Sequence, residues 1–190
     1  MNHKVKVMLS NRHVHLSPEA LAVLFGEGAE LTVKAQLGRE FAAHQTVDLV
    51  RPKGTIKNVR IIGPAHRPET QVELLFGDRY KLGVNAPVRN SHDLAGSAPI
   101  KLVGPAGEVE LTEGAIVARR HVHMNLAQAA EIGVVHGQIV SLKCLGERPL
   151  IFEDVHVVAS DRCRELVVHL DSEEGNAAGL KNDDLVEIIV

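Results

Sequence analysis

The chain has 190 residues, a formal net charge of −3, 45% hydrophobic residues and 3% aromatic residues. This charge gives no electrostatic case for nucleic-acid binding, and the scarcity of aromatic side chains argues against stacking platforms for bases or sugars. No apolar run approaches the ~20 residues that cross a membrane. Two cysteines, Cys144 and Cys163, are too few for a disulfide scaffold, so we expect a cytoplasmic protein.

Short strands are expected along most of the chain. Residues 4–9 and 46–50 alternate polar and apolar side chains, as half-buried strands do. Residues 100–103 and 108–111 flank a turn rich in Gly and Pro, which predicts a hairpin. The other predicted strands are residues 55–62, 138–144, 152–159, 165–170 and 185–190.

Three short helices are predicted, each after a side chain that can cap backbone N–H groups. Many short strands with few helices indicate all-β barrels closed by small helices. The turn-rich residues 84–98 are expected to form a loop or linker between two halves of the chain. The predicted helices are residues 19–25 after Ser17, residues 126–132 after Asn125, and the stretch up to Gly179 after Asp171.

An internal repeat supports the division into halves. The tripeptide His-Val-His occurs at residues 13–15 and 121–123, each time after an arginine. A shift of 108 residues brings the following helices into step, and it also aligns the apolar runs 31–33 and 139–141. Further along, a shift of 96 residues places Asn58-Val59-Arg60 against Asp154-Val155-His156, and Glu73 against His169.

The repeated histidines predict two metal sites. Residues i and i+2 of a strand point to the same face, roughly 6 to 7 Å apart at the backbone, so two imidazoles can converge on one ion. Catalytic zinc takes three protein ligands and keeps a fourth position open. A lone His-x-His is more often a solvated strand face, but surface histidines have no reason to repeat with a matched third partner. The predicted ligands are His13, His15 and Glu73 in one half and His121, His123 and His169 in the other.

Arginines accompany both predicted sites. Arg67 lies six residues before Glu73, and a guanidinium beside a metal site can clamp phosphate or carboxylate, although a surface arginine fits the sequence equally well. Its counterpart in the second half is Cys163, either a soft metal ligand or a small packed residue. Arg12 and Arg120, just before the histidine pairs, either bind anions or share a structural role.

These residues and their neighbours resemble one protein family, the PduL-type phosphate propanoyltransferases, which are zinc-dependent phosphotransacylases. The similarity extends from about Lys4 to the C-terminus, with the motifs in matching order. The motifs are Ser10-Asn11-Arg12-His13-Val14-His15-Leu16-Ser17, Gly63-Pro64 with Arg67, Thr70-Gln71-Val72-Glu73, Arg120-His121-Val122-His123-Met124, and His169-Leu170-Asp171 with Glu174-Gly175-Asn176-Ala177-Ala178.

The resemblance implies a fold and an activity. The fold is mainly β, with two β-barrel domains capped by short α-helices: residues 12–118 form the central barrel, and residues 119–190 join residues 1–11 in the second. The activity interconverts a short-chain acyl-CoA (acetyl- or propanoyl-CoA) plus phosphate with acyl phosphate plus CoA. The resemblance also implies two zinc ions on the predicted ligands, with other divalent metals possible, and makes a homodimer plausible.

By motif matching, Arg67 is the phosphate-binding arginine and Ser91 an active-site serine. Two positions depart from the family pattern, because Met8 and His92 stand where glycine is usual, so the residues of the CoA groove are left unassigned. Only nine residues precede Ser10, so we expect a free cytoplasmic enzyme without a microcompartment-targeting extension.

The expected mechanism is direct attack of phosphate on the thioester at a dizinc site. The alternative is a zinc-dependent hydrolase of a thioester or amide, with metal-bound water as the nucleophile. A non-catalytic module held together by closed metal sites is the third possibility.

Overall fold

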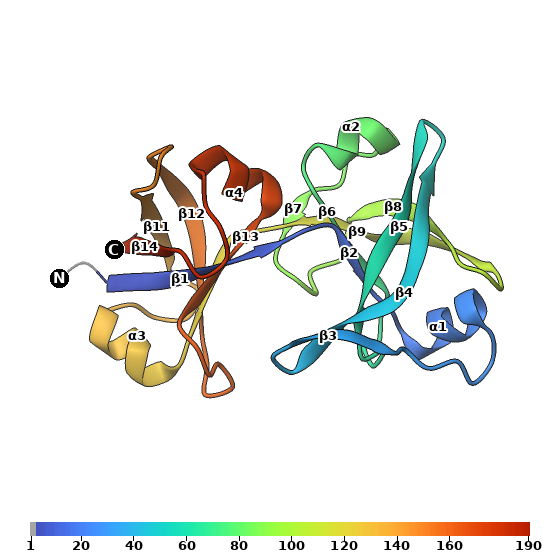
Figure 1. The fold of residues 1–190 in the computed structure, drawn as a ribbon, viewed down its shortest axis with the longest axis horizontal. Helices are drawn as coiled ribbons and strands as arrows, with labels where there is room; N and C mark the ends of the chain where they lie inside the picture. Colours follow the sequence, from blue (N-terminus) through green and yellow to red (C-terminus); the bar gives the residue numbers. More distant parts are fainter. Residues whose placement is uncertain (1–2) are drawn as a thin grey trace. The chain divides into compact units, whose positions relative to one another are not determined.

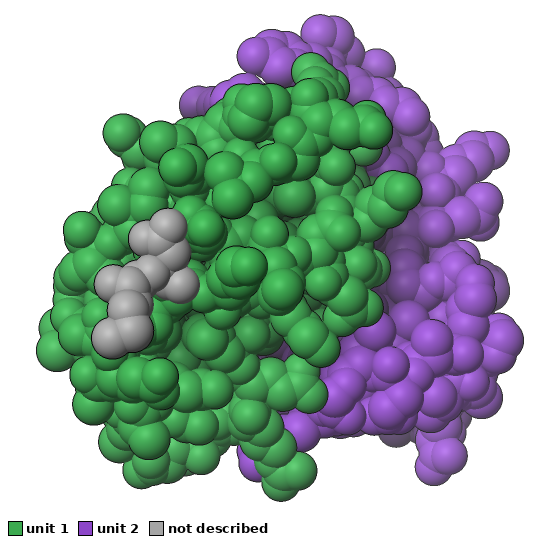
Figure 2. All heavy atoms as spheres, turned by 60° about the vertical axis from the view of Figure 1, so that its left-hand side comes forward, with its two compact units in different colours: residues 1–11, 119–190 green, residues 12–118 purple. Residues whose placement is uncertain are grey.

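The computed structural model describes residues 3–190, so the first two residues of the second predicted domain lie outside the described part. The chain forms two compact units, coloured separately in Figure 2: unit 2 is Arg12–Ala118, and unit 1 combines the residues up to Asn11 with Arg119–Val190. The two predicted domains have the same bounds, and their status as independent domains stays a prediction. No helix within residues 3–190 has the length and apolarity to span a membrane.

Unit 1 is a closed barrel with the strand order β1-β13-β10-β12-β11-β14 (Figure 1). The strand β1 closes it, because it pairs in parallel with β13 and antiparallel with β14. Two short helices accompany the barrel. The elements are β1 (His3–Ser10), β10 (His121–Met124), α3 (Leu126–Ile132), β11 (Ile139–Cys144), β12 (Leu150–Ala159), β13 (Val167–Asp171), α4 (Ser172–Ala178) and β14 (Leu185–Ile189).

Unit 2 also contains a closed ring of strands, in the order β4-β5-β2-β6-β9-β8. The strand β8 closes the ring because it pairs with both β4 and β9. The predicted class, a mainly β fold with two barrels and short helices, is therefore confirmed. The elements are β2 (His13–His15), α1 (Pro18–Phe25), β3 (Val33–Leu37), β4 (Glu40–Arg51), β5 (Gly54–Gly63), β6 (Gln71–Leu74), α2 (Asp78–Leu82), β7 (Val88–Arg89), β8 (Ala98–Val103) and β9 (Glu108–Ala118).

Strand alternation explains how each barrel fills its interior. Along β1 the valines Val5 and Val7 are buried while the lysines beside them are exposed, as the alternating sequence predicts. In unit 1 the core includes Val122, Leu142 and Val168, all fully buried. Unit 2 has its own core, which includes Val14, Leu16, Leu49, Ile61, Val72 and Ile100. Each unit thus has a separate hydrophobic core.

The three predicted helices are present and begin at the predicted caps. The hydroxyl of Ser17 accepts a hydrogen bond from the Ala20 N–H at the start of α1. Reciprocal capping boxes open the other two helices, formed by Asn125 with Gln128 and by Asp171 with Glu174. Local side-chain chemistry was sufficient to predict these starts.

Two predictions of chain organisation were wrong. Residues 84–98 do not link the halves: they lie inside unit 2, where β7 pairs with β9, and the chain changes unit at positions 11/12 and 118/119. The apolar runs 31–33 and 139–141 are not equivalent either. The counterpart of β11 is β4, since Val140 pairs with Val155 of β12 as Val47 pairs with Val59 of β5.

The separate core of unit 1 leads to a prediction about the stability of the protein. Leu142 is fully buried, so Leu142→Ala should lower the free energy of unfolding by about 2–5 kcal/mol through lost burial and the cavity left behind. Leu145→Ala is the control, because Leu145 is 56% exposed, and it should change the free energy by less than about 0.5 kcal/mol. Urea unfolding followed by circular dichroism measures both, and equal effects would contradict the packing described.

Candidate functional site

Strand register brings the predicted ligands together in both units. In unit 2 the strand β2 lies between β5 and β6, and His13 stands directly opposite Glu73. In unit 1 the strand β10 lies between β12 and β13, and His121 stands opposite His169. In each unit the first pairing is parallel and the second antiparallel, so the repeat of the sequence is also a repeat of the pairing.

In unit 2 the side chains of His13, His15 and Glu73 form a compact group whose ligand atoms all lie within 4.8 Å of one another. The ring centroids of the two histidines are 5.0 Å apart, and Nε2 of His13 is 3.4 Å from Oε2 of Glu73. Val14, between the histidines, is fully buried. The strand thus points both imidazoles to one face and anchors them through the core on the other.

A buried arginine adjoins this group. Arg67 is 9% exposed, and its Nη2 lies 3.2 Å from Nε2 of His15. Because a guanidinium only donates, Nε2 of His15 accepts this hydrogen bond with its lone pair, and the ring proton is on Nδ1. Burial, followed by the electrostatic effect of His13 and of the Arg67 guanidinium, lowers the pKa of His15 to about 2. The imidazole is therefore neutral at physiological pH.

The guanidinium of Arg67 is held from two further sides. Its Nη2 donates to Oε1 of Glu40 at 3.1 Å, and its Nη1 donates to the hydroxyl of Ser91 at 3.4 Å. The structure therefore brings Arg67 and Ser91, the two predicted catalytic residues, to the His13, His15 and Glu73 group. A fixed guanidinium and a hydroxyl side by side can donate hydrogen bonds to an anion.

Two residues of this network were missed in the sequence. Gln71 donates through Nε2 to Oε1 of Glu73 at 2.6 Å and to the Ser91 hydroxyl at 3.0 Å, and its Oε1 accepts from the N–H of His92 at 2.8 Å. Strand alternation could have revealed Gln71, because it lies two residues before Glu73. Glu40 gave no signal, since the β3–β4 hairpin brings it to the site from a distant part of the chain.

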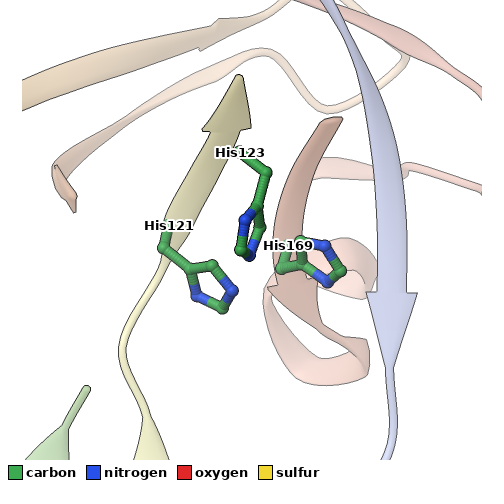
Figure 3. Close-up of side chains that lie close together, drawn as sticks. All are labelled: His121, His123 and His169. Carbon is green, nitrogen blue, oxygen red and sulfur yellow. The ribbon is translucent and has the colours of Figure 1, made fainter. Parts of the chain in front are cut away.

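In unit 1 three histidines form the second group, and Figure 3 shows their rings pointing toward one another. The centroids of His121, His123 and His169 are 4.8 to 5.0 Å apart, with the rings of His121 and His169 stacked. Burial and the neighbouring His121 lower the pKa of His123 to about 4. The imidazole of His123 is therefore neutral at physiological pH, and the three rings offer ligand atoms within 4.8 Å of one another.

The donor sets fit a divalent metal ion. Three imidazoles, or two imidazoles with a carboxylate, are the ligand sets of open zinc sites. Nδ1 of His121 lies 2.8 Å from the carbonyl oxygen of Arg119, which only accepts, so Nδ1 carries the proton and Nε2 keeps the lone pair. Backbone carbonyls orient metal-bound histidines in this manner.

The arginines before the histidine pairs have a shared structural role. Nε of Arg12 lies 2.6 Å from Oδ2 of Asp78 in α2, and Nε of Arg120 lies 2.6 Å from Oε1 of Glu174 in α4. The two carboxylates are again 96 positions apart. Burial raises the pKa of Glu174, and Arg120 opposes that rise. Of the two open interpretations of Arg12 and Arg120, the structure favours the structural one.

Cys163, the counterpart of Arg67, lies near the histidine group of unit 1. Its Sγ is 3.4 Å from Nδ1 of His123, but within residues 3–190 the compact group of potential ligand atoms in unit 1 is formed by His121, His123 and His169 without it. The thiol is therefore a neighbour of the group in this structure.

Comparisons with known proteins agree with this geometry. The model of the phosphate propanoyltransferase family matches residues 6–181. A phosphate propanoyltransferase of Shewanella putrefaciens is 46% identical over 181 residues, covering 94% of this chain and 84% of that protein. The protein of the same name from Thermotoga maritima is 47% identical over 189 residues, covering 96% and 88%, and that of Lachnoclostridium phytofermentans is 44% identical over 187 residues, covering 97% and 87%. The resemblance found in the sequence is thereby confirmed, and the chain belongs to the phosphate propanoyltransferase family of acyltransferases.

Proposed function

We propose that the chain transfers a short acyl group, acetyl or propanoyl, between CoA and inorganic phosphate. The single observation that carries the proposal is the buried guanidinium of Arg67, 3.2 Å from His15 in a compact three-ligand group. That arrangement places a fixed anion-binding side chain beside a predicted metal site, which phosphate as a reactant requires. Membership in the phosphate propanoyltransferase family supports the acyl group and its acceptor.

We further propose one zinc ion in each unit, held in unit 2 by His13, His15 and Glu73 and in unit 1 by His121, His123 and His169. Other divalent ions fit the same nitrogen and oxygen donors. Bound zinc would supply a Lewis acid for the thioester carbonyl and a thiophilic centre. The protein's contribution would be to keep His15 and His123 neutral through burial and to hold the proton of His121 on Nδ1, so that its Nε2 faces the ion.

Phosphate binding is assigned to Arg67 and Ser91. Arg67 neutralises and orients the anion, which converts a bimolecular encounter into a positioned attack. In this structure the Ser91 hydroxyl accepts from Gln71 at 3.0 Å and donates to Oε1 of Glu73 at 3.4 Å, and it can turn its proton to a phosphate oxygen when the anion binds. Glu40 accepts from Arg67 and restricts the guanidinium to one orientation.

In the proposed reaction a phosphate oxygen forms a new C–O bond to the thioester carbonyl carbon. The C–S bond then breaks, CoA leaves as the thiolate, and the acyl phosphate remains. No acyl-enzyme is required. The reverse reaction uses the same groups, with the thiolate of CoA as the nucleophile.

A cavity of about 670 Å³ in unit 2 is unsuited to the nucleotide part of CoA. Its lining includes the carboxylates of Glu19, Glu69, Asp93 and Glu113, which would repel the phosphates of the nucleotide. The apolar side chains of the same lining are compatible with an uncharged part of a substrate. We therefore propose that the CoA nucleotide binds elsewhere on the protein.

The homodimer, the cytoplasmic location and a free enzyme outside microcompartments stay predictions. They rest on the resemblance and on the sequence.

Replacing Arg67 tests the phosphate site. Arg67→Ala should raise the KM for phosphate at least about 10-fold and lower kcat, because charged hydrogen bonds to the anion are lost. Zinc content should remain two per chain, measured by atomic absorption. Arg39→Ala, an exposed arginine of the same unit, is the control and should leave phosphate kinetics unchanged. If both variants behave alike, the role assigned to Arg67 is wrong.

Replacing a ligand of unit 1 tests the metal proposal. His121→Ala should lower zinc content from two ions per chain to one and reduce turnover at least about 100-fold. Loss of a residue that only hydrogen-bonds to a metal ligand already lowers metal affinity or activity about 10–100-fold, and loss of the ligand itself should cost more. His136→Ala, an exposed histidine of unit 1 outside the group, should change neither quantity. Unchanged zinc content in His121→Ala would remove this residue from the ligand set.

The dependence of thiol release on phosphate separates the transferase from the hydrolase. With acetyl- or propanoyl-CoA, release of the CoA thiol should require phosphate and should yield an equal amount of acyl phosphate, trapped as its hydroxamate. A metal-bound water nucleophile would release the thiol without phosphate. Thiol release at the same rate in phosphate-free buffer would favour the hydrolase.

A further inference from the structure

The contact between Cys163 and His123 has a definite hydrogen-bond direction. Cys163 follows β12 in a turn, where its N–H donates to the Ser160 carbonyl at 2.9 Å. Its half-buried Sγ lies 3.4 Å from Nδ1 of His123 and 3.6 Å from the carbonyl oxygen of Val158. The thiol therefore lies between a ring nitrogen and a backbone acceptor.

The proton count determines which group donates. A thiol has one proton, and the Val158 carbonyl can only accept, so the S–H of Cys163 donates to Val158. The sulfur is then the acceptor for Nδ1–H of His123. In the opposite arrangement the thiol would donate its proton to Nδ1 of His123. No proton would then remain between the sulfur and the carbonyl oxygen of Val158 to form a hydrogen bond. Nδ1–H of His123 thus donates to the sulfur, and the S–H donates to the carbonyl. With the ring proton on Nδ1, the lone pair of His123 is on Nε2.

The same position in unit 2 also contacts the second histidine of its pair. Arg67 and Cys163 are 96 residues apart in the repeat, and their partners His15 and His123 are 108 residues apart. Arg67 donates to Nε2 of His15, whereas Cys163 accepts from Nδ1 of His123. Both contacts place the ring proton on Nδ1, but Arg67 donates to the Nε2 lone pair of His15, whereas Cys163 leaves that of His123 open. One position of the repeat thus orients the second imidazole in both units, through different chemistry.

We infer that Cys163 is a positioning residue, which fixes the tautomer and ring orientation of His123 for metal binding. The inference rests on the metal site proposed for unit 1. Cys163 acts through His123: it neither ligates the ion nor attacks the substrate. The partner of Nδ1 in a metal-bound histidine is usually a carboxylate, a backbone carbonyl or water, and here it is a thiol whose own proton is directed to a carbonyl.

Zinc affinity of the full chain tests the inference, measured by competition with a chromophoric chelator. In Cys163→Ala one of the two ions should bind about 10–100-fold more weakly, as expected when the partner of a metal-bound histidine is lost. Cys163→Ser should stay within about threefold of the unmodified protein, because a hydroxyl also donates once and accepts once. Equal affinities of Cys163→Ala and the unmodified protein would overturn the inference.

Cys144→Ala is the matched control. Cys144 is 1% exposed in the core of the same unit and is not a member of the histidine group. Its replacement should lower the free energy of unfolding while both zinc affinities remain unchanged. A weaker zinc affinity in Cys163→Ala therefore cannot be attributed to a general loss of stability. If Cys163→Ala does not fold, Cys163→Ser carries the test, and a 10-fold loss of affinity in that variant counts against the inference.

Cobalt substitution and turnover separate the remaining roles of the thiol. If Cys163 were a ligand, the cobalt-loaded protein would show a thiolate-to-metal charge-transfer band that disappears in Cys163→Ala; we expect no such band. If Cys163 were a nucleophile, the alanine and serine variants would both lose turnover while zinc affinity stayed unchanged. Either result would overturn the inference. An unmodified chain that binds no zinc would overturn the proposed metal sites as well, whereas two ions of unchanged affinity in Cys163→Ala would overturn this inference alone.

Discussion

The structure depends on one constraint: a His-Val-His strand must keep its register against the strand that carries the third member of its compact group, Glu73 or His169. Alternation along the strand directs His13 and His15 to one face and the fully buried Val14 to the other. A slip of one residue would turn the imidazoles into the core and expose the valine. The packing of each barrel and the geometry of each histidine group are thus determined by the same pairing, His13 with Glu73 and His121 with His169.

The repeat made most of the site predictable from sequence, because it reports three-dimensional equivalence. His13 and His121, 108 residues apart, occupy the same place relative to their neighbouring strands. Glu73 and His169, the third members of the two groups, are matched by the shift of 96 residues. The repeat also contained an unused signal. Asp78 is 96 residues before Glu174, so the helix over Asp78–Leu82, which was not predicted, is the counterpart of α4. Its five residues and its lack of a capping side chain gave no local signal of a helix.

Other parts could not be predicted because they depend on contacts between segments far apart in the chain. The strand β3 has five exposed residues and pairs with β4, so neither alternation nor burial marks it in the sequence. That strand also explains the wrong alignment of residues 31–33, because it lies between α1 and the true counterpart of β11. Glu40 opens β4 after the turn at residues 38–39, and the Glu40 contact with Arg67 follows only from the folded hairpin.

Charge explains why the two sites can differ at the position shared by Arg67 and Cys163. An imidazole that ligates through its lone pair adds no charge, so a divalent ion held by the three histidines of unit 1 would keep its full charge. In unit 2 the carboxylate of Glu73 replaces the third imidazole and removes one positive charge, which Arg67 restores beside the group. Glu40 neutralises part of that charge, but its side chain is 39% exposed and therefore screened by water and salt. If Glu73 ligates an ion and an anion binds beside it, as proposed, this charge balance calls for an arginine in unit 2, whereas in unit 1 the same position holds the smaller side chain of Cys163.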